Sequence, residues 1–294
     1  MTIPTKTLAS GFSLPVYGLG LWQMGGRWEA DVTKDAAEIA AIRAALDAGI
    51  THFDTAESYG NGHAEELLGK AIQGYDRSKL IIASKVAANN QSYDGVRHSF
   101  EASLKRLQTD YIDLYLLHRY PEPGIDIAET MRAIDELVEQ GLIKNVGVCN
   151  MSPNRFDDVQ KHTKNKLVCN QVHYNVLVRE VEELGVLDKC QRDDILLAAW
   201  GPVQKGMLPE VPLMQELATK YGKTTTQVAI NWLISQKNVV VISKTSSLQH
   251  LQENLGAVDW QMDEADIERI RAEYPDQQMI SDRVPLTYEA DIPV

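Results

Sequence analysis

Eight short runs rich in apolar residues alternate along the chain with longer amphipathic stretches. The strand-like runs cover residues 16–21, 52–54, 80–84, 112–117, 145–148, 168–171, 195–199 and 239–242. The helical stretches cover residues 35–48, 63–73, 93–108, 127–140, 152–162, 181–192, 211–221 and 224–235, and residues 248–256 and 263–272 add two more after the last strand. Strand and helix alternating in this way predict a parallel sheet closed into a (β/α)8 TIM barrel of the α/β class, with extra C-terminal helices.

An open, doubly wound sheet is the alternative arrangement. It needs a glycine-rich phosphate-binding turn after the first strand, and the segment Gly18-Leu19-Gly20-Leu21-Trp22-Gln23 lacks the third glycine of that turn. Residues 5–8 and 13–16, on either side of Gly11, predict a short N-terminal hairpin. Because no Pro/Ser-rich linker or block of charge interrupts the pattern, we expect residues 1–294 to form a single barrel domain.

Composition narrows the class of protein. The net charge is −12 and no Lys/Arg run is present, which argues against a nucleic-acid partner. The first residues form no apolar signal segment, and no apolar run approaches the ~18 residues of a membrane span. The cysteines, Cys149, Cys169 and Cys190, are too few and too scattered for a disulfide framework. We therefore expect a cytoplasmic protein without membrane contact.

Four chemically active side chains fall at or just beyond three consecutive predicted strands. Asp54 ends the second strand and Tyr59 lies in the loop after it, whereas Lys85 and His118 directly follow the third and fourth strands. Each has an ordinary explanation alone: a helix cap, a half-buried phenol, a solvated rim charge or a core histidine. Since the residues after the strands of a (β/α)8 barrel form its active face, their joint occurrence favours a catalytic site.

These four residue types complement one another chemically. A phenol has an ordinary pKa of ~10, and a nearby ammonium favours the phenolate and lowers that value. A carboxylate would hold the ammonium in place and offset the cost of burying it. A neutral imidazole can donate a hydrogen bond to a carbonyl oxygen. The set suits a reaction in which a carbonyl gains a hydride on carbon and a proton on oxygen.

The sequence resembles the aldo-keto reductase superfamily, in particular its bacterial-type members, from about residue 16 to residue 255. The matching motifs are Phe53-Asp54-Thr55-Ala56 with Tyr59-Gly60-Asn61, Ser84-Lys85, Asp113-Leu114-Tyr115-Leu116-Leu117-His118, Gly147-Val148-Cys149-Asn150, Asn170-Gln171-Val172 with Tyr174-Asn175, and Ser243-Lys244-Thr245 with Glu253-Asn254. The resemblance implies reduction of an aldehyde or ketone with NADPH, NADH being possible but less preferred. It also implies that Tyr59 is the general acid, that Lys85 and Asp54 tune the pKa of Tyr59, and that His118 orients the substrate carbonyl.

The resemblance also implies a cofactor site. Asn150 and Gln171 match residues that hold the nicotinamide carboxamide, Trp200 stands where an aromatic residue stacks on the nicotinamide, Lys244 would face the 2′-phosphate or pyrophosphate, and Asn254 would face the adenine. The full expected cofactor-binding set is Gly20, Leu21, Trp22, Asp54, Cys149, Asn150, Gln171, Trp200, Gly201, Pro202, Lys205, Gly206, Ser243, Lys244, Thr245, His250, Glu253 and Asn254. The expected substrate pocket consists of Trp22, Tyr59, His118 and Tyr120.

The chain departs from the family pattern at two cofactor positions. Cys149 stands where Ser is common, and a thiol is the weaker hydrogen-bonding group. His250 stands where many members carry an Arg for the 2′-phosphate, which replaces a forked, always-charged guanidinium with an imidazole. We therefore expect a smaller preference for NADPH than is usual in the family. The resemblance implies that loops such as the short segment 119–124 and the tail around residues 284–288 select the substrate.

Two other function classes fit parts of the pattern. Some members of the superfamily use the fold as a cofactor-binding regulatory subunit with little turnover, and such members can keep the four residues. A metal-dependent hydrolase could use His52, His118 and Asp54, but no further cluster of metal-ligating residues follows the later strands, so no metal is expected. The favoured reading is a carbonyl reductase acting on a small molecule, as a monomer or weak homo-oligomer.

Overall fold

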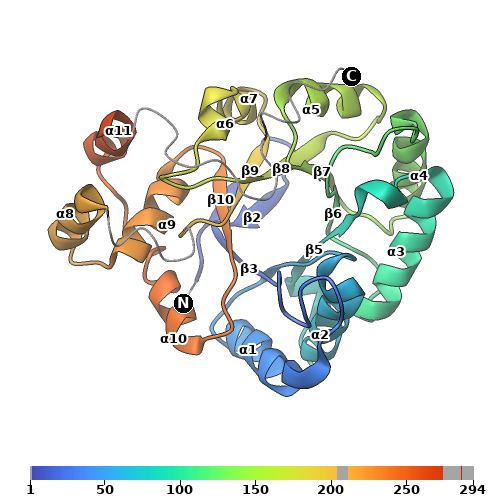
Figure 1. The fold of residues 1–294 in the computed structure, drawn as a ribbon, viewed down its shortest axis with the longest axis horizontal. Helices are drawn as coiled ribbons and strands as arrows, with labels where there is room; N and C mark the ends of the chain where they lie inside the picture. The colour runs from blue at the N-terminus through green and yellow to red at the C-terminus, as the bar shows by residue number, and fades with distance from the viewer. Residues whose placement is uncertain (1, 204–210, 274–285, 287–294) are drawn as a thin grey trace.

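A closed barrel of eight parallel strands forms the centre of the computed structural model, which describes residues 2–203, 211–273 and 286 (Figure 1). The strands follow one another around the barrel in chain order, and β10 closes it by pairing with β3. They are β3 (Tyr17–Gly20), β4 (His52–Asp54), β5 (Ile81–Val86), β6 (Leu114–Leu117), β7 (Val146–Cys149), β8 (Leu167–His173), β9 (Leu196–Trp200) and β10 (Val239–Ser243). The predicted (β/α)8 barrel is confirmed.

Helices surround the barrel, following the chain order except for α11, which lies back beside α8 (Figure 1). They are α1 (Asp35–Asp47), α2 (His63–Ala71), α3 (Tyr93–Leu107), α4 (Ile127–Glu139), α5 (Pro153–Lys161), α6 (Glu180–Glu183), α7 (Val186–Arg192), α8 (Pro212–Tyr221), α9 (Thr225–Ser235), α10 (Leu248–Leu255) and α11 (Glu264–Glu273), with short 3-10 turns η1 (Val32–Lys34), η2 (Tyr59–Gly62), η3 (Arg77–Lys79) and η4 (Ala88–Asn90). The prediction of a single helix over residues 181–192 is wrong, because the structure has two helices there. Gly185 adopts a left-handed conformation, with φ of +69°, and separates α6 from α7.

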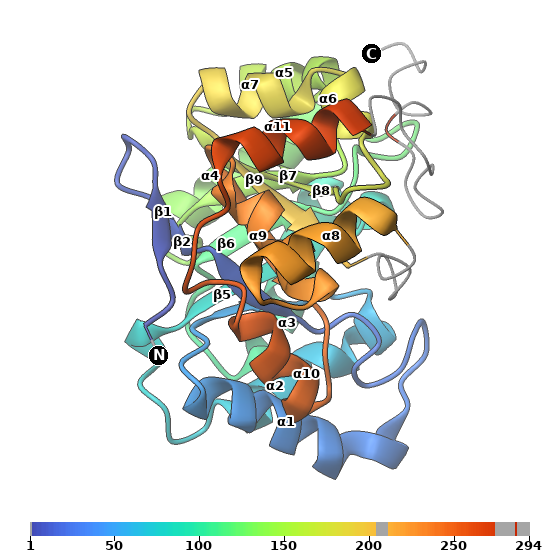
Figure 2. The same cartoon turned by 90° about the vertical axis from the view of Figure 1, so that its left-hand side faces the viewer.

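The predicted N-terminal hairpin is confirmed, and it seals one end of the barrel (Figure 2). Strands β1 (Thr5–Thr7) and β2 (Ser13–Pro15) pair antiparallel. Leu8 and Leu14 are buried in the same apolar cluster as interior side chains of the barrel strands, such as Leu114 and Val240. The barrel interior is therefore a packed core at this end, and it becomes polar only toward the carboxyl ends of the strands.

Side-chain alternation brings the polar residues of neighbouring strands into the barrel interior. In β4, His52 and Asp54 lie two residues apart and so share the inner face. The strand before it makes room for the imidazole, because a Cβ on Gly18 would lie 2.5 Å from Nδ1 of His52. Lys85 in β5 and Gln171 in β8 are also buried, and both bond to Asp54. Side chains of these strands thus form a polar layer at one end of the barrel.

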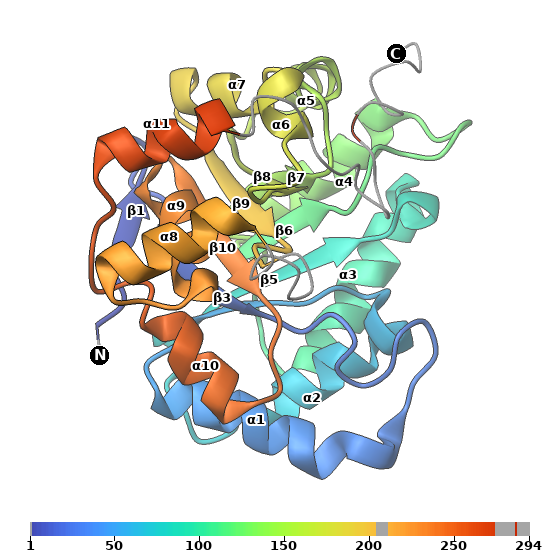
Figure 3. The ribbon, with the colours of Figure 1, turned by 60° about the vertical axis from the view of Figure 1, so that its left-hand side comes forward.

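The last two helices lie outside the regular strand–helix repeat. In Figure 3, α11 runs beside α8, and the ion pairs of Arg269 with Glu216 and of Lys220 with Asp266 join the two helices. The extra C-terminal helices expected from the sequence are therefore present. Within the described residues, every helix is too short or too polar to cross a bilayer.

Candidate active site

A buried ammonium lies at the centre of the polar layer. Nζ of Lys85 donates hydrogen bonds to Oδ2 of Asp54 at 2.7 Å, to the carbonyl oxygen of Thr55 at 2.7 Å and to the hydroxyl oxygen of Tyr59 at 3.1 Å. The other carboxylate oxygen of Asp54 accepts from Nε2 of Gln171 at 2.6 Å. The Lys85 side chain is 0% exposed. Because an ammonium has three N–H groups, all of its donors are used, and both carboxylate oxygens are engaged by protein donors.

Burial dominates the electrostatics of Tyr59. It raises the pKa of the phenol to about 12, although the nearby Lys85 ammonium lowers it and Asp54 raises it further. The expectation that Lys85 favours the phenolate is confirmed in direction, but the net pKa is above, not below, its ordinary value. For Lys85 itself, burial lowers the pKa, but Asp54 and Tyr59 outweigh that effect and hold the pKa above its usual range. Lys85 therefore stays charged and Tyr59 stays protonated at neutral pH.

His118 follows β6 and faces Tyr59, with ring centroids 5.7 Å apart and planes at 71°. Burial, helped by the charges of Lys85 and Arg119, holds its pKa well below the ordinary value, so the imidazole is neutral. The Ser58 hydroxyl lies 3.4 Å from Nδ1 of His118. That contact is compatible with the tautomer that carries its N–H on Nε2.

The predicted nicotinamide residues come together on the opposite side of the barrel mouth. Nε1 of Trp200 donates to Oδ1 of Asn150 at 3.2 Å, and Nδ2 of Asn150 donates to the His118 carbonyl at 3.2 Å. The Trp200 ring stacks on His173, with centroids 3.9 Å apart and planes 9° from parallel. Gly201 follows with φ of +67°, and a Cβ there would lie 2.8 Å from Nε2 of His173. These contacts thus fix the orientation of the half-buried Trp200 ring.

A hollow of about 350 Å³ lies between the loop after β3, the start of α1 and the loop after β10. It is lined by Gln23, Lys34, Ala37, Glu38, Lys244 and Ser246. Lys244, predicted to face a cofactor phosphate, is exposed here, and Lys34 adds a second ammonium that the sequence did not point to. Two ammonium groups around one hollow fit a phosphate-bearing ligand.

The expected adenosine residues cluster on and before α10. Ser243, Thr245 and Asn254 are buried, and Nδ2 of Asn254 donates to the Tyr17 hydroxyl at 3.0 Å and to Oγ of Ser243 at 3.4 Å. His250 is exposed on the first turn of α10, and Glu253 lies one turn further on. The side-chain NH2 group of Asn254 therefore connects α10 to the barrel. The side-chain carbonyl oxygen of Asn254 is the atom that remains for a ligand.

The remaining predicted residues have different outcomes. Leu21 extends β3 by donating its N–H to the Asp54 carbonyl at 2.8 Å, and Cys149 is buried beside Asp54 and Lys85 in the barrel. Burial raises the pKa of the Cys149 thiol far above its ordinary range, so the thiol is neutral. Gly20 ends β3, and Pro202 directly follows Gly201. Lys205 and Gly206 lie outside the described residues.

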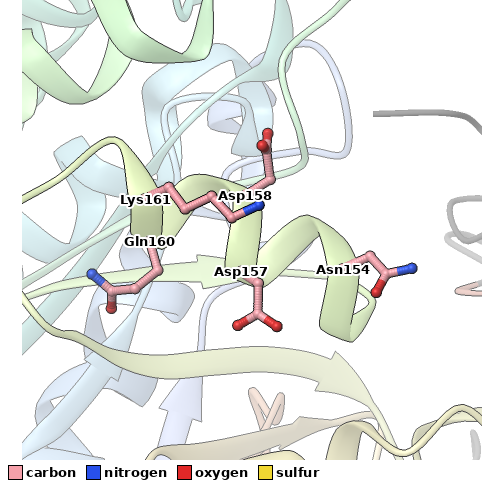
Figure 4. Close-up of a pocket in the computed structure, with 5 residues that line it drawn as sticks. All are labelled: Asn154, Asp157, Asp158, Gln160 and Lys161. Atoms are coloured by element: carbon pink, nitrogen blue, oxygen red, sulfur yellow. The ribbon is translucent and has the colours of Figure 1, made fainter.

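Tyr120 is only partly buried, and its hydroxyl group bonds to a residue of α5. Its hydroxyl donates to Asp158 at 2.5 Å, and the Arg155 guanidinium lies 3.8 Å from its ring centre. A second hollow, of about 580 Å³, runs along α5, as Figure 4 shows; its lining consists of Asn154, Asp157, Asp158, Gln160 and Lys161. None of these residues belongs to the cluster around Lys85. The α5 hollow is therefore a surface feature separate from the catalytic constellation.

Several contributors were missed from the sequence. His173 follows Gln171 by two residues on β8, so the period of a strand could have placed it on the same face. Trp22, a predicted substrate-pocket residue, contacts both Tyr59 and Trp28. Trp28 was not predicted. No periodicity marks Trp28, since it lies in an irregular loop.

Comparisons with known proteins agree with this geometry. The sequence model described as the aldo/keto reductase family matches residues 17–274. The chain is 33% identical over 273 residues to methylglyoxal reductase YeaE of Escherichia coli K12, covering 90% of this chain and 92% of that protein. It is 32% identical over 278 residues to glyoxal reductase of Bacillus subtilis 168, covering 94% of each.

Solved structures show the same likeness. The thermostable aldo-keto reductase Tm1743, solved with the inhibitor epalrestat, is 38% identical with a TM-score of 0.89, covering 92% of this chain and 99% of that one. An aldo/keto reductase of Klebsiella pneumoniae, solved with NADP and acetate, is 32% identical with a TM-score of 0.83, covering 94% and 96%.

The Lys85–Asp54 ion pair predicts a pH-dependent change in stability. Lys85→Met leaves the Asp54 carboxylate buried without its cation, so we expect the free energy of unfolding to fall by about 3–5 kcal/mol at pH 8. Burial then favours the protonated carboxyl in the folded state, so stability is partly recovered at pH 5 and lost as the pH rises. Urea denaturation at both pH values measures this.

The double variant Lys85→Met/Asp54→Asn provides the control. It removes the unpaired charge, so its loss should be smaller than the sum of the two single losses and should depend little on pH. Additive losses that are the same at pH 5 and pH 8 would show that the two charges are not coupled.

Proposed function

Because the chain belongs to the aldo/keto reductase family and is an NAD(P)H-dependent oxidoreductase, we propose that it reduces an aldehyde or ketone to the alcohol, with NADPH as reductant and Tyr59 as general acid. Tyr59 would give its hydroxyl proton to the carbonyl oxygen as the carbonyl carbon gains the hydride that NADPH would supply, leaving NADP⁺, and a proton from solvent would then restore the phenol. The matched relatives named for methylglyoxal and glyoxal support a carbonyl substrate for this chain.

The observation that carries this proposal is the direction of one hydrogen bond. Lys85 can only donate, so the hydroxyl oxygen of Tyr59 accepts from Nζ at 3.1 Å. The hydroxyl hydrogen is thereby left for the oxygen of a bound carbonyl compound. The neutral His118 beside it can donate a second hydrogen bond to that oxygen and fix the orientation of the carbonyl.

The residues present also fit the cofactor. Bound NADPH supplies the hydride. Trp200 offers a flat ring for the nicotinamide, Asn150 and Gln171 offer amides for its carboxamide, and Lys244 and Lys34 offer cations for a phosphate in the hollow between them. In the structure these amides bond to His118, Trp200 and Asp54, so they also connect the cofactor side of the site to the catalytic side.

Removing the Tyr59 hydroxyl tests the general acid. Tyr59→Phe keeps the ring that packs against Trp22 and His118, so cofactor affinity should change by no more than a few fold. Loss of a positioned acid should lower kcat for carbonyl reduction by about 10²–10⁴-fold. The measurement is NADPH oxidation at saturating cofactor, with affinity followed by protein fluorescence. Activity within tenfold of wild type would remove Tyr59 from the mechanism.

Adding charge at His250 tests the 2′-phosphate contact. We expect His250→Arg to lower the Kd for NADPH about tenfold through a charge-assisted hydrogen bond and to leave that for NADH nearly unchanged. Gln252→Arg is the matched control, because it adds the same charge to an exposed position of the same helix. Equal shifts for both cofactors, or the same NADPH gain in the control, would place the phosphate elsewhere.

Other expectations from the sequence stay predictions. These are a preference for NADPH that is weaker than usual in the family, a cytoplasmic location, a monomeric or weakly homo-oligomeric state, and the lack of a metal or a nucleic-acid partner.

A further inference from the structure

Trp28 lies in the loop between β3 and α1 with 59% of its surface exposed. Among the described residues, only Val32 and Leu248 are comparably exposed large hydrophobic side chains. In Figure 3 this loop, drawn in blue, extends beyond the carboxyl ends of the strands, where the catalytic residues are. An exposed indole at the active end of the barrel is a surface that an apolar ligand can cover.

Ring contacts connect Trp28 to the proposed acid. The Trp28 ring meets that of Trp22 edge-on, with centroids 4.9 Å apart and planes at 65°. Trp22 in turn meets Tyr59 with centroids 4.9 Å apart at 67°. Trp22 is partly buried, whereas Trp28 is exposed. The three rings therefore form a continuous aromatic surface that leads from the Tyr59 ring out to solvent.

The backbone fixes this surface relative to Tyr59. The N–H of Gly60, next to Tyr59, donates to the carbonyl of Arg27, next to Trp28, at 3.2 Å. Gly60 has φ of +56°, and a Cβ there would lie 2.3 Å from the carbonyl oxygen of Gly25. The N–H of Gly25 donates to Oε2 of Glu38 on α1 at 2.6 Å. Residues 25–27 of the loop are thus held against both the catalytic segment and α1.

We infer that Trp28, with Trp22, binds an aromatic substituent of the substrate, so that the preferred carbonyl compounds are aryl aldehydes or ketones. The inference rests on the proposed reductase function. A carbonyl oxygen held at Tyr59 and His118 places its substituent next to Trp22, and a ring of the substrate can then cover the exposed face of Trp28. A small aliphatic aldehyde has no ring to pack on Trp28.

Selectivity between two aldehydes measures this contact. The ratio of kcat/KM for 4-nitrobenzaldehyde to that for propionaldehyde should fall about tenfold in Trp28→Ala, the order expected for losing one aromatic contact. Trp28→Phe should keep most of the wild-type ratio because it keeps a ring. Val32→Ala, an exposed apolar residue a few positions along the same loop, should keep the wild-type ratio.

Each alternative outcome is distinct. Equal falls in kcat/KM for both aldehydes in Trp28→Ala would mean that the indole only supports the loop, and kcat/KM values unchanged for both would mean that it does not touch the substrate; either result overturns the inference. Absence of turnover with both aldehydes in the wild type would contradict the proposed function instead. Calorimetric binding of 4-nitrobenzaldehyde to the protein loaded with NADP⁺, which cannot deliver hydride, then tests Trp28 alone: affinity should fall about tenfold in Trp28→Ala, and unchanged affinity overturns the inference.

Discussion

The buried ammonium of Lys85 is the group on which the rest of the site depends. A cation with no exposed surface is stable only where acceptors replace its water, and Asp54, the Thr55 carbonyl and Tyr59 do so. These acceptors come from β4 and the loop that follows it, while Lys85 comes from β5. Gln171, from the far side of the barrel, bonds the second oxygen of Asp54. Closure of the barrel is therefore what assembles the site, since no single strand–helix unit contains it.

The same burial sets the protonation states around the ammonium. It keeps Tyr59 protonated and His118 neutral, so both can donate to a carbonyl oxygen near neutral pH. Deeper in the barrel, burial lowers the pKa of His52 to about 4, and neither of its ring nitrogens has a hydrogen-bond partner within the described part of the chain. Lys85 and Asp54 thus provide the charged pair of a layer that is otherwise kept neutral.

The sequence predicted the strands and site residues that follow from hydrophobic periodicity. It did not predict the features that depend on irregular backbone conformation. Period-2 and period-3.6 patterns placed the eight strands, and positions after the strands gave Asp54, Lys85 and His118. The break at Gly185 was missed because glycine is tolerated within a helical pattern until its backbone conformation is known. The aromatic chain to Trp28 depends on the contact between Gly25 and Gly60, which are 35 positions apart. The net pKa of Tyr59 required the degree of burial, which residue types alone do not give.

The pH dependence of kcat/KM for carbonyl reduction tests the central claim most directly. In the proposed mechanism reduction requires Tyr59 protonated, so activity should be lost as the pH rises through a pKa of about 12. It also requires His118 neutral, so it is lost as the pH falls through a pKa well below the ordinary histidine value. The account therefore predicts a flat profile between about pH 6.5 and pH 9.5, measured at saturating NADPH. An alkaline loss of activity centred between about pH 7 and pH 8.5 would show that the group donating the proton is not a phenol held in this buried, protonated state.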